Sequence, residues 1–198
     1  MLRLLGRATS GNVQKVIFAL EELKLPYERE DFGRQFGNTL TDDYAALNPT
    51  RKVPTLIDGD LVIWESGAIL RYLAAKAQSP LYPAELAARS YVDRWLDWLQ
   101  ASLNPVYLAG FRDAKKPVEE RAADTTANML AELKLLDTQL TAHPFITGSA
   151  FTLADIALGP IIRRCVAFPL GLPELPHVMI WLEALQARPA FQKAVSAG

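Results

Sequence analysis

Residues 48–66 read NPTRKVPTLIDGDLVIWES, and this stretch decides the fold of the chain. Its two apolar runs, 53–57 and 61–64, flank an Asp-Gly-Asp turn, a pattern typical of an antiparallel β-hairpin. Pro54 stands at the start of the first run, where a strand tolerates a residue without an amide hydrogen. The apolar spacing of residues 66–77 then predicts a helix that follows the hairpin directly.

The residues before this hairpin alternate strand-like and helix-like signals. Residues 2–5 form a short apolar run, and residues 27–32 predict a second strand. Residues 39–47 predict a short helix. Between the two strands, four apolar residues have the spacing of one helical face: Val13, Val16, Ile17 and Leu20. The order β-α-β-α-β-β-α predicts a small mixed sheet covered by helices.

A linker at residues 78–83, which contains two prolines, separates this module from a part with helical spacing throughout. We therefore predict an α+β protein with a domain at 1–77 and an all-helical domain at 84–198. The first long helix, from Ala84, has two apolar faces and the next has one. Their stripes are Tyr91, Trp95 and Trp98; Val92, Leu96, Leu99 and Leu103; and Met129, Leu133, Leu136 and Leu140.

A third long helix begins at a capping box, with Thr152 as the N-cap and Asp155 three residues later. Pro160 is expected to kink this helix because it lacks an amide hydrogen. Pro173 and Pro189 are expected to open two shorter helices.

The composition limits the classes of function. The 198 residues are 50% hydrophobic and 22% charged, which suits a folded protein and excludes a disordered one. The 21 basic residues nearly balance the 22 acidic residues, so we expect no binding to nucleic acid or to an anionic membrane. No apolar run approaches the roughly 20 residues of a membrane span, and no signal peptide follows Met1. We expect a cytoplasmic protein.

Cys165 is the single cysteine of the chain, which excludes an intramolecular disulfide and a CxxC redox pair. We interpret it as a small buried apolar residue. The two histidines, His143 and His177, have no acid or cysteine at metal-ligand spacing, so we expect no metal.

Four motifs share an order and spacing that resemble the glutathione transferase superfamily over essentially the whole chain. They are residues 4–6 with 9–16, residues 48–56, residues 64–69 and the capping box at 152–155. The likeness is to bacterial glutathione S-transferases of the serine, theta-like or nu-like type. It implies a thioredoxin-like first domain, glutathione as a co-substrate and a homodimer.

The first motif places hydroxyls at the start of the first helix, whose amides and dipole favour an anion such as a thiolate. The resemblance implies that Ser10 contacts the glutathione thiol and that Asn12 is a second contact. Thr9 is the rival to Ser10, since a shift of one residue in the loop brings its hydroxyl forward. The structural alternative is that these side chains only cap the helix.

The second motif contains Lys52, Val53 and Pro54. In the superfamily the bond before this proline is cis, which implies that Val53 turns its N–H and C=O outward to pair with a cysteinyl residue. Lys52 resembles the base that meets the glycine carboxylate of glutathione. Arg51 stands where many relatives have glycine, so the backbone there is expected to differ.

The third motif, Glu65-Ser66, opens a helix. Ser66 offers a hydroxyl and an amide to the γ-glutamyl carboxylate, while Glu65 accepts from the γ-glutamyl ammonium. An ordinary N-cap with a nearby acid is the alternative. Gln35 and Phe36 belong to a loop that in relatives often reaches glutathione.

The resemblance implies an enzyme that activates glutathione as a thiolate for attack on a small electrophile. A glutathione-dependent disulfide reductase and a non-catalytic binding protein for glutathione or hydrophobic ligands are the alternatives. In the family, the second substrate lies against the start of the helical domain, for which Tyr107, Phe111 and Arg112 are candidates.

Overall fold

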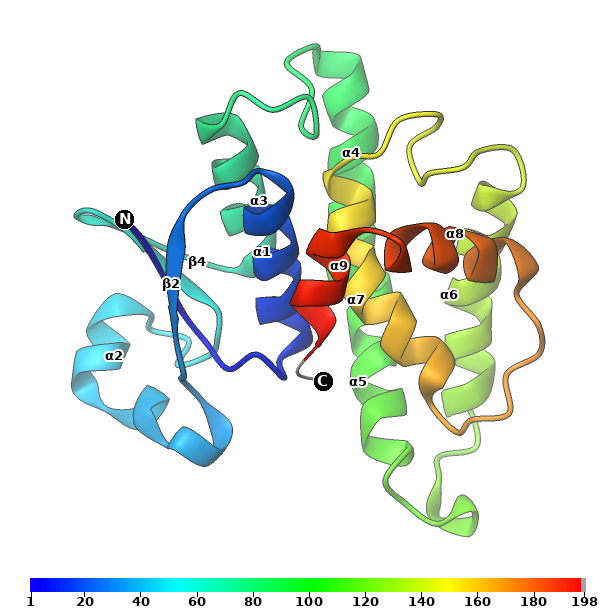
Figure 1. Cartoon of the computed structure of the whole chain (residues 1–198). Coiled ribbons are helices and arrows are strands. Elements are labelled where there is room, and N and C mark those ends of the chain that lie inside the picture. The colour runs from blue at the N-terminus through cyan, green and yellow to red at the C-terminus, as the bar shows by residue number, and fades with distance from the viewer. Residues whose placement is uncertain (197–198) are drawn as a thin grey trace. The chain divides into compact units, whose positions relative to one another are not determined.

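The computed structural model describes residues 1–196, which form two compact units. The first unit contains residues 1–82 together with helix α9 (Pro189–Val195), and the second contains residues 83–187. The last two residues of the predicted 84–198 domain lie outside the described residues. Figure 1 shows the course of the chain through both units.

A four-stranded sheet forms the centre of the first unit. Its strands are β1 (Leu2–Leu5), β2 (Tyr27–Glu30), β3 (Thr55–Asp58) and β4 (Leu61–Trp64), in the order β2-β1-β3-β4. β1 pairs parallel with β2 and antiparallel with β3, and β3 pairs antiparallel with β4. The predicted mixed sheet and its hairpin are therefore confirmed. Gly59, at φ +59°, occupies the hairpin turn, where a side chain would be strained.

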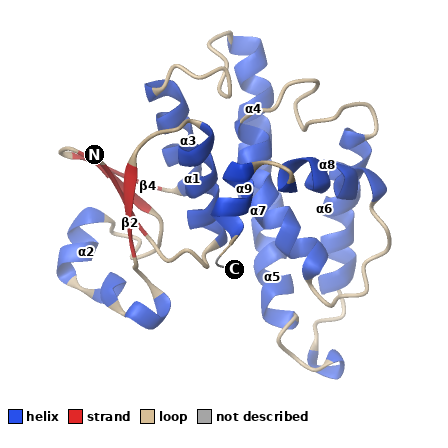
Figure 2. Cartoon of the chain, viewed as in Figure 1, coloured by secondary structure: helices blue, strands red, loops and turns tan. Residues whose placement is uncertain are grey.

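Three helices cover this sheet. They are α1 (Gly11–Glu22), α2 (Asp42–Leu47) and α3 (Ser66–Lys76), which complete the predicted βαβαββα order of a thioredoxin-like domain. Figure 2 shows the sheet between α2 on one side and α1 with α3 on the other.

The chain returns to the first unit at its C-terminal end, where α9 packs on α1 (Figure 1). The rings of Phe18 and Phe191 meet edge to face with centroids 5.2 Å apart. The Arg188 guanidinium donates to both carboxylate oxygens of Glu22, each at 2.7 Å. This bidentate pair and the apolar contact join the two helices.

The segment after β2 differs from the prediction. A helix over 39–47 was expected, but two 3₁₀ turns, η1 (Arg34–Phe36) and η2 (Asn38–Leu40), precede α2. Thr41 is extended and its side chain accepts from the amide of Tyr44, so it ends one element and caps the next. β2 also ends at Glu30, two residues before the predicted end.

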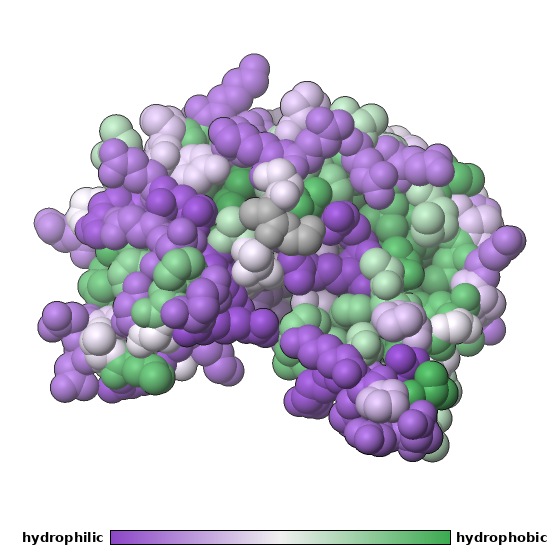
Figure 3. Space-filling model, turned by 60° about the horizontal axis from the view of Figure 1, so that its bottom comes forward, coloured by the Kyte–Doolittle hydropathy of each residue, from purple (hydrophilic) through white to green (hydrophobic). Residues whose placement is uncertain are grey.

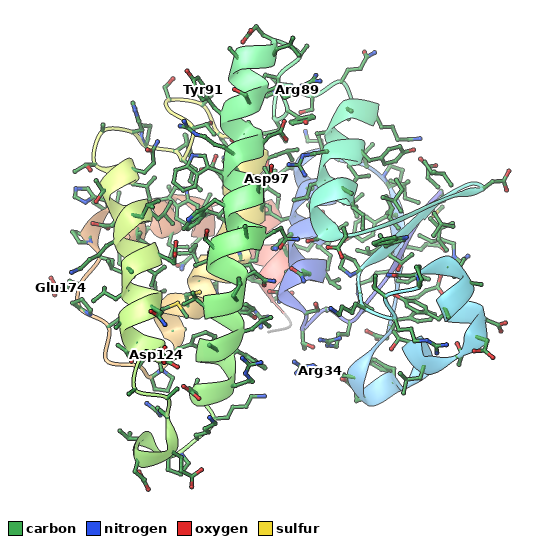
Figure 4. All side chains as sticks on the ribbon, turned by 180° about the vertical axis from the view of Figure 1, so that it is seen from behind. Arg34, Arg89, Tyr91, Asp97, Asp124 and Glu174 are labelled. Atoms are coloured by element: carbon green, nitrogen blue, oxygen red, sulfur yellow. The ribbon has the colours of Figure 1, made fainter. Side chains whose placement is uncertain are left out.

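The second unit is helical, as predicted. It contains α4 (Leu86–Trp98), the π-helical turn η3 (Leu99–Leu103), α5 (Asn104–Asp113), the 3₁₀ turn η4 (Val118–Glu120), α6 (Thr125–Leu140), α7 (Leu153–Ala167) and α8 (Pro176–Gln186). The predicted stripe on α6 is buried along its whole length, as is the second stripe on α4 and η3. The other α4 stripe is buried at Trp95, whereas Tyr91 is 49% exposed. In Figure 4 Tyr91 and Arg89 project from different sides of α4.

The capping box at the start of α7 is present. Thr152 accepts from the amide of Ala154, and Asp155 accepts from the amide of Thr152. Asp155 is fully buried and also accepts from the Ile146 amide and the Trp181 indole. The box therefore connects α7 with α8 and with the loop before it.

The prediction that Pro173 opens a helix is wrong, because α8 begins at Pro176. A proline disfavours helical geometry in the residue before it, and Leu175 accordingly lies at φ −128°, ψ 74°. A helix started at Pro173 would be interrupted there. Pro189 does open α9 as predicted. No helix among residues 1–196 is long and apolar enough to cross a membrane.

Candidate active site

A cavity of about 290 Å³ opens in the first unit where the β1–α1 loop, the segment after β2 and the loop before β3 meet. On the face shown in Figure 3, hydrophilic side chains predominate over this unit. The residues that line the cavity are Arg7, Ser10, Asn12, Gly33, Arg34, Thr39, Arg51, Lys52 and Val53.

Ser10 is the N-cap of α1, but its hydroxyl does not cap the helix. The carbonyl of Ser10 accepts from the amide of Gln14 at 2.9 Å, and its amide donates to the carbonyl of Arg7 at 3.1 Å. The main chain alone therefore starts the helix. Ser10 lines the cavity, at the positive end of α1.

Gln14 holds the loop that carries Ser10. Its side chain is fully buried and donates from Nε2 to the carbonyl of Ala8 at 3.0 Å. On the other side, a Cβ at Gly6 would lie 2.5 Å from a methyl group of Val13, so only glycine allows this close approach. This role of Gln14 could not be predicted, since the residue stands in the sequence as an ordinary helix residue.

Of the three candidate thiol contacts, Ser10 and Asn12 line the cavity, whereas Thr9 is exposed and is not among the lining residues. Asn12 lies on the first turn of α1. This arrangement brings one hydroxyl and one amide side chain together at a helix N-terminus.

A buried polar network supports the segment with Lys52, Val53 and Pro54. The Tyr44 hydroxyl donates to the carbonyl of Lys52 at 2.7 Å, and Asn48 Nδ2 donates to the same carbonyl at 2.9 Å. Both side chains also bond to the hydroxyl of Thr55. The Val53–Pro54 bond is cis, as the family resemblance implies. Lys52 is exposed and Val53 half-buried at the cavity wall.

Arg51 keeps a backbone conformation that suits glycine, with φ +53°. Its guanidinium donates to the carbonyls of Leu40 and Thr41 and contacts the carboxylate of Asp42. These bonds compensate for the left-handed backbone. The backbone was expected to differ here from that of relatives with glycine. This expectation is not met, because Arg51 adopts a conformation that glycine also adopts.

Glu65 and Ser66 lie at the start of α3 and do not line the cavity. Glu65 is the N-cap at φ +69°, its side chain is exposed, and it makes no capping hydrogen bond. Ser66 is buried at the first helical position. Neither side chain is therefore used as an ordinary N-cap.

Lys15 is a buried cation on α1 that sequence reasoning missed, because it falls among the apolar positions of an amphipathic helix. Its side chain is 1% exposed. Burial lowers the pKa of Lys15 to about 7, while the negative charge of Glu65 acts in the opposite direction.

The segment after β2 contributes different residues from those predicted. Gly33, Arg34 and Thr39 line the cavity, while Gln35 and Phe36 are exposed and do not. Figure 4 shows the Arg34 side chain extending out from η1 on the side away from α2.

The candidate residues for contact with the second substrate lie on α5, and the two aromatic ones pack within the second unit. Tyr107 and Phe111 pack against Phe168, with ring centroids 5.9 and 6.4 Å from it, and Arg112 is exposed. Cys165 is fully buried, as predicted, and burial raises the pKa of its thiol to about 12. It therefore stays protonated at neutral pH.

Both histidines line a second cavity of about 310 Å³, between the end of α6 and α8. His177 Nδ1 lies 3.2 Å from a carboxylate oxygen of Asp137, which also accepts from the amides of His177 and Val178. Sequence spacing missed this acid, which lies 40 positions away on another helix. Asp137 caps the start of α8 from α6.

Comparison with known proteins decides the family. The family model described as the glutathione S-transferase N-terminal domain matches residues 9–76, and the corresponding C-terminal domain matches residues 117–191. Glutathione S-transferase GstB of Escherichia coli K12 is 38% identical over 98% of both chains. The chain belongs to the glutathione S-transferase family.

Solved glutathione S-transferases share the fold. A theta-class enzyme from Xanthomonas axonopodis pv. citri with glutathione bound is 39% identical, with a TM-score of 0.90 over 100% of this chain and 98% of that one. A family member from Pseudomonas fluorescens with two glutathione molecules bound is 30% identical, with a TM-score of 0.88 over 98% of this chain and 92% of that one. Glutathione S-transferase 3 of Zea mays is 35% identical over 99% of this chain and 94% of its own length. The predicted family, fold and glutathione transferase activity are thereby confirmed.

Proposed function

We propose that this glutathione transferase binds glutathione in the cavity of the first unit and holds its sulfur as a thiolate at the N-terminus of α1. The observation that carries the proposal is Ser10, which lines the cavity and whose side chain does not cap its helix. A free thiol has a pKa of about 8.5, so only a few per cent is ionised at neutral pH. One hydrogen bond and the helix dipole both favour the ionised form.

Asn12 is a second contact to the sulfur in this proposal. It lies on the first turn of α1 and lines the same cavity. Thr9 has an exposed side chain and serves as the comparison residue. Catalysis then consists of ionising the thiol and holding it near a small electrophile.

The remaining groups of glutathione have matching partners in the proposal. The Val53 main chain pairs with the cysteinyl residue, with Pro54 shaping the segment, and Lys52 meets the glycine carboxylate. The Tyr44–Asn48–Thr55 network supports this assignment because it fixes the Lys52 carbonyl. Ser66 holds the γ-glutamyl carboxylate and Glu65 the γ-glutamyl ammonium.

A role in detoxification, a cytoplasmic location and a homodimer complete the proposal. The exposed Leu86 and Tyr91 on α4 support a dimer, because large apolar side chains gather at protein interfaces. Whether the second substrate is an electrophile or a disulfide is decided by comparing the rates of turnover with an aryl halide and with a disulfide.

The Ser10→Ala substitution tests the catalytic assignment. Loss of one hydrogen bond to a charged sulfur is worth about 1.5–3 kcal/mol, so kcat/KM with 1-chloro-2,4-dinitrobenzene should fall about 10- to 100-fold. The pKa of the bound thiol, measured by thiolate absorbance, should rise in parallel. Thr9→Ala is the matched control and should leave both unchanged.

Equal activity of Ser10→Ala and the native protein would remove Ser10 from this role. Turnover of hydroxyethyl disulfide in the same preparations measures the reductase alternative. A disulfide rate well above the aryl halide rate would replace the electrophile with a disulfide as the substrate class.

A further inference from the structure

The cavity of about 310 Å³ in the second unit has no part in the proposed function. It lies between the C-terminal end of α6 and α8, two helices that pack on each other within this unit (Figure 1). Its volume falls in the range of small-molecule sites, and an apolar cavity of about 150 Å³ already accommodates a benzene ring. The cavity is therefore large enough for one substituted aromatic ring.

The walls of this cavity are mostly apolar. Trp181 is buried, and its indole donates to Asp155, which holds the ring in place. Ile180 also lines the cavity and is 64% exposed, so a bound apolar group would shield it from water. Among the described residues that line the cavity there is no Asp, Glu, Lys or Arg. These walls favour a neutral ligand, because a charge without a partner is costly to desolvate.

His177 gives the cavity one oriented polar group. Its Nδ1 lies 3.2 Å from Oδ2 of Asp137. Oδ1 of Asp137 accepts from the amides of His177 and Val178, each at 2.9 Å, so the carboxylate is fixed at the start of α8. An ionised carboxylate only accepts hydrogen bonds, so Nδ1 carries a proton. Nε2, on the opposite edge of the ring, is then the nitrogen that can meet a ligand.

We propose that this cavity binds neutral phenols, with the hydroxyl bonded to His177 Nε2 and the ring against Trp181 and Ile180. A neutral imidazole accepts from the phenol O–H, and an imidazolium donates to the same oxygen, so a phenol suits either form of His177. The aromatic ring packs against the indole and buries apolar surface there. This site belongs to the second unit alone and does not depend on the glutathione site proposed above.

Proton NMR of the histidine rings tests the proposal. The chain has 2 histidines, His143 and His177, and both line this cavity, so their Cε1–H signals report on it. The spectrum of His143→Gln assigns the two signals. Titration with phenol should shift the His177 signal along a saturable curve, with a Kd in the millimolar range for so small a ligand. A His177 signal that stays unmoved up to about 10 mM phenol would overturn the proposal.

Benzene is the matched probe, because it has the ring without the hydroxyl. Phenol should bind the native protein about 3- to 10-fold more tightly than benzene, which is the effect of one net hydrogen bond. In His177→Phe this advantage should disappear, as read from the His143 signal, because burying a hydroxyl without a partner is unfavourable. Lys134→Met changes an exposed lysine of α6 outside the cavity and should keep the native preference.

Each outcome bears on the phenol site alone. If benzene binds the native protein as tightly as phenol, the cavity is a purely apolar one and the proposal is wrong. If His177→Phe keeps the preference for phenol, His177 is not the group that meets the hydroxyl. Should that variant fail to fold, the comparison of phenol with benzene on the native protein still decides the matter.

Discussion

The burial of Lys15 has a cost to stability that depends on pH. Its pKa is about 7 in the folded protein and 10.5 in the unfolded chain, so folding at low pH must either bury a charge or shed a proton. The cost is full below pH 7 and declines as pH rises from 7 to 10.5.

Lys15→Met should therefore stabilise the protein, most strongly in acid. Taking about 1.4 kcal/mol per pKa unit, the free energy of unfolding should rise by about 5 kcal/mol at pH 6 and by about 2 kcal/mol at pH 9. Urea unfolding at the two pH values measures this, with Lys134→Met as the control. A gain that is equal at both pH values would show that folding does not lower the pKa of Lys15.

Single residues also show how much of the candidate site could be predicted from the sequence. The cavity is lined by four residues that the family resemblance makes candidates, namely Ser10, Asn12, Lys52 and Val53. Each belongs to a motif at a helix start or before a strand. Arg34 and Thr39 could not be predicted, since the segment that carries them has two 3₁₀ turns and no periodic pattern. The burial of Lys15 could not be predicted, because the acid that acts on it, Glu65, is 50 positions away in the sequence.

Among the elements, α7 depends on one buried carboxylate. Asp155 accepts from two amides and the Trp181 indole, and burial raises its pKa while these donors lower it. Asp155→Ala leaves three buried donors without an acceptor and should destabilise the protein by about 4 kcal/mol. Thermal unfolding measures the loss.

Thr138→Ala is a control for that substitution, because Thr138 is exposed and its hydroxyl donates to the carbonyl of Lys134 within α6. It should change stability by less than about 0.5 kcal/mol. A similar effect of the two substitutions would contradict the role of the capping box as a link between helices.

The start of a helix could be predicted where nearby side chains cap it. It could not be predicted where a residue from another helix helps to set it. The start of α7 follows from Thr152 and Asp155, both within one turn. The start of α8 depends on Pro176 and on Asp137 of α6, which accepts from the first amides of the helix. The π-helical turn at Leu99–Leu103 precedes Pro105, which lacks the amide hydrogen that an unbroken α-helix needs there.

For the whole molecule, the return of α9 makes the first unit discontinuous in sequence. A chain that ends at Ala187 lacks the Phe191 ring and the pairing of Arg188 with Glu22. The lost burial should cost about 4 kcal/mol and lower the melting temperature. Lys193→Met is the control, since its exposed pair with Glu21 contributes little. An unchanged melting temperature of the shortened chain would contradict this.

The proposed homodimer is tested by light scattering across concentrations. A mass of twice 21.9 kDa is expected. Leu86→Glu and Tyr91→Glu together place charges on the exposed apolar positions of α4 and should shift the mass toward the monomer. A single mass of 21.9 kDa for the native protein at all concentrations would refute the dimer.

The position of α9 also sets the order in which the first unit is assembled on the ribosome. α1 is synthesised early, but its partner helix follows only after the whole second unit. At about 5–20 residues per second, roughly 10 to 30 s separate the two. During that interval the face of α1 that receives Phe191 has no covering helix, so the nascent chain is open to chaperones and to aggregation until α9 has been added.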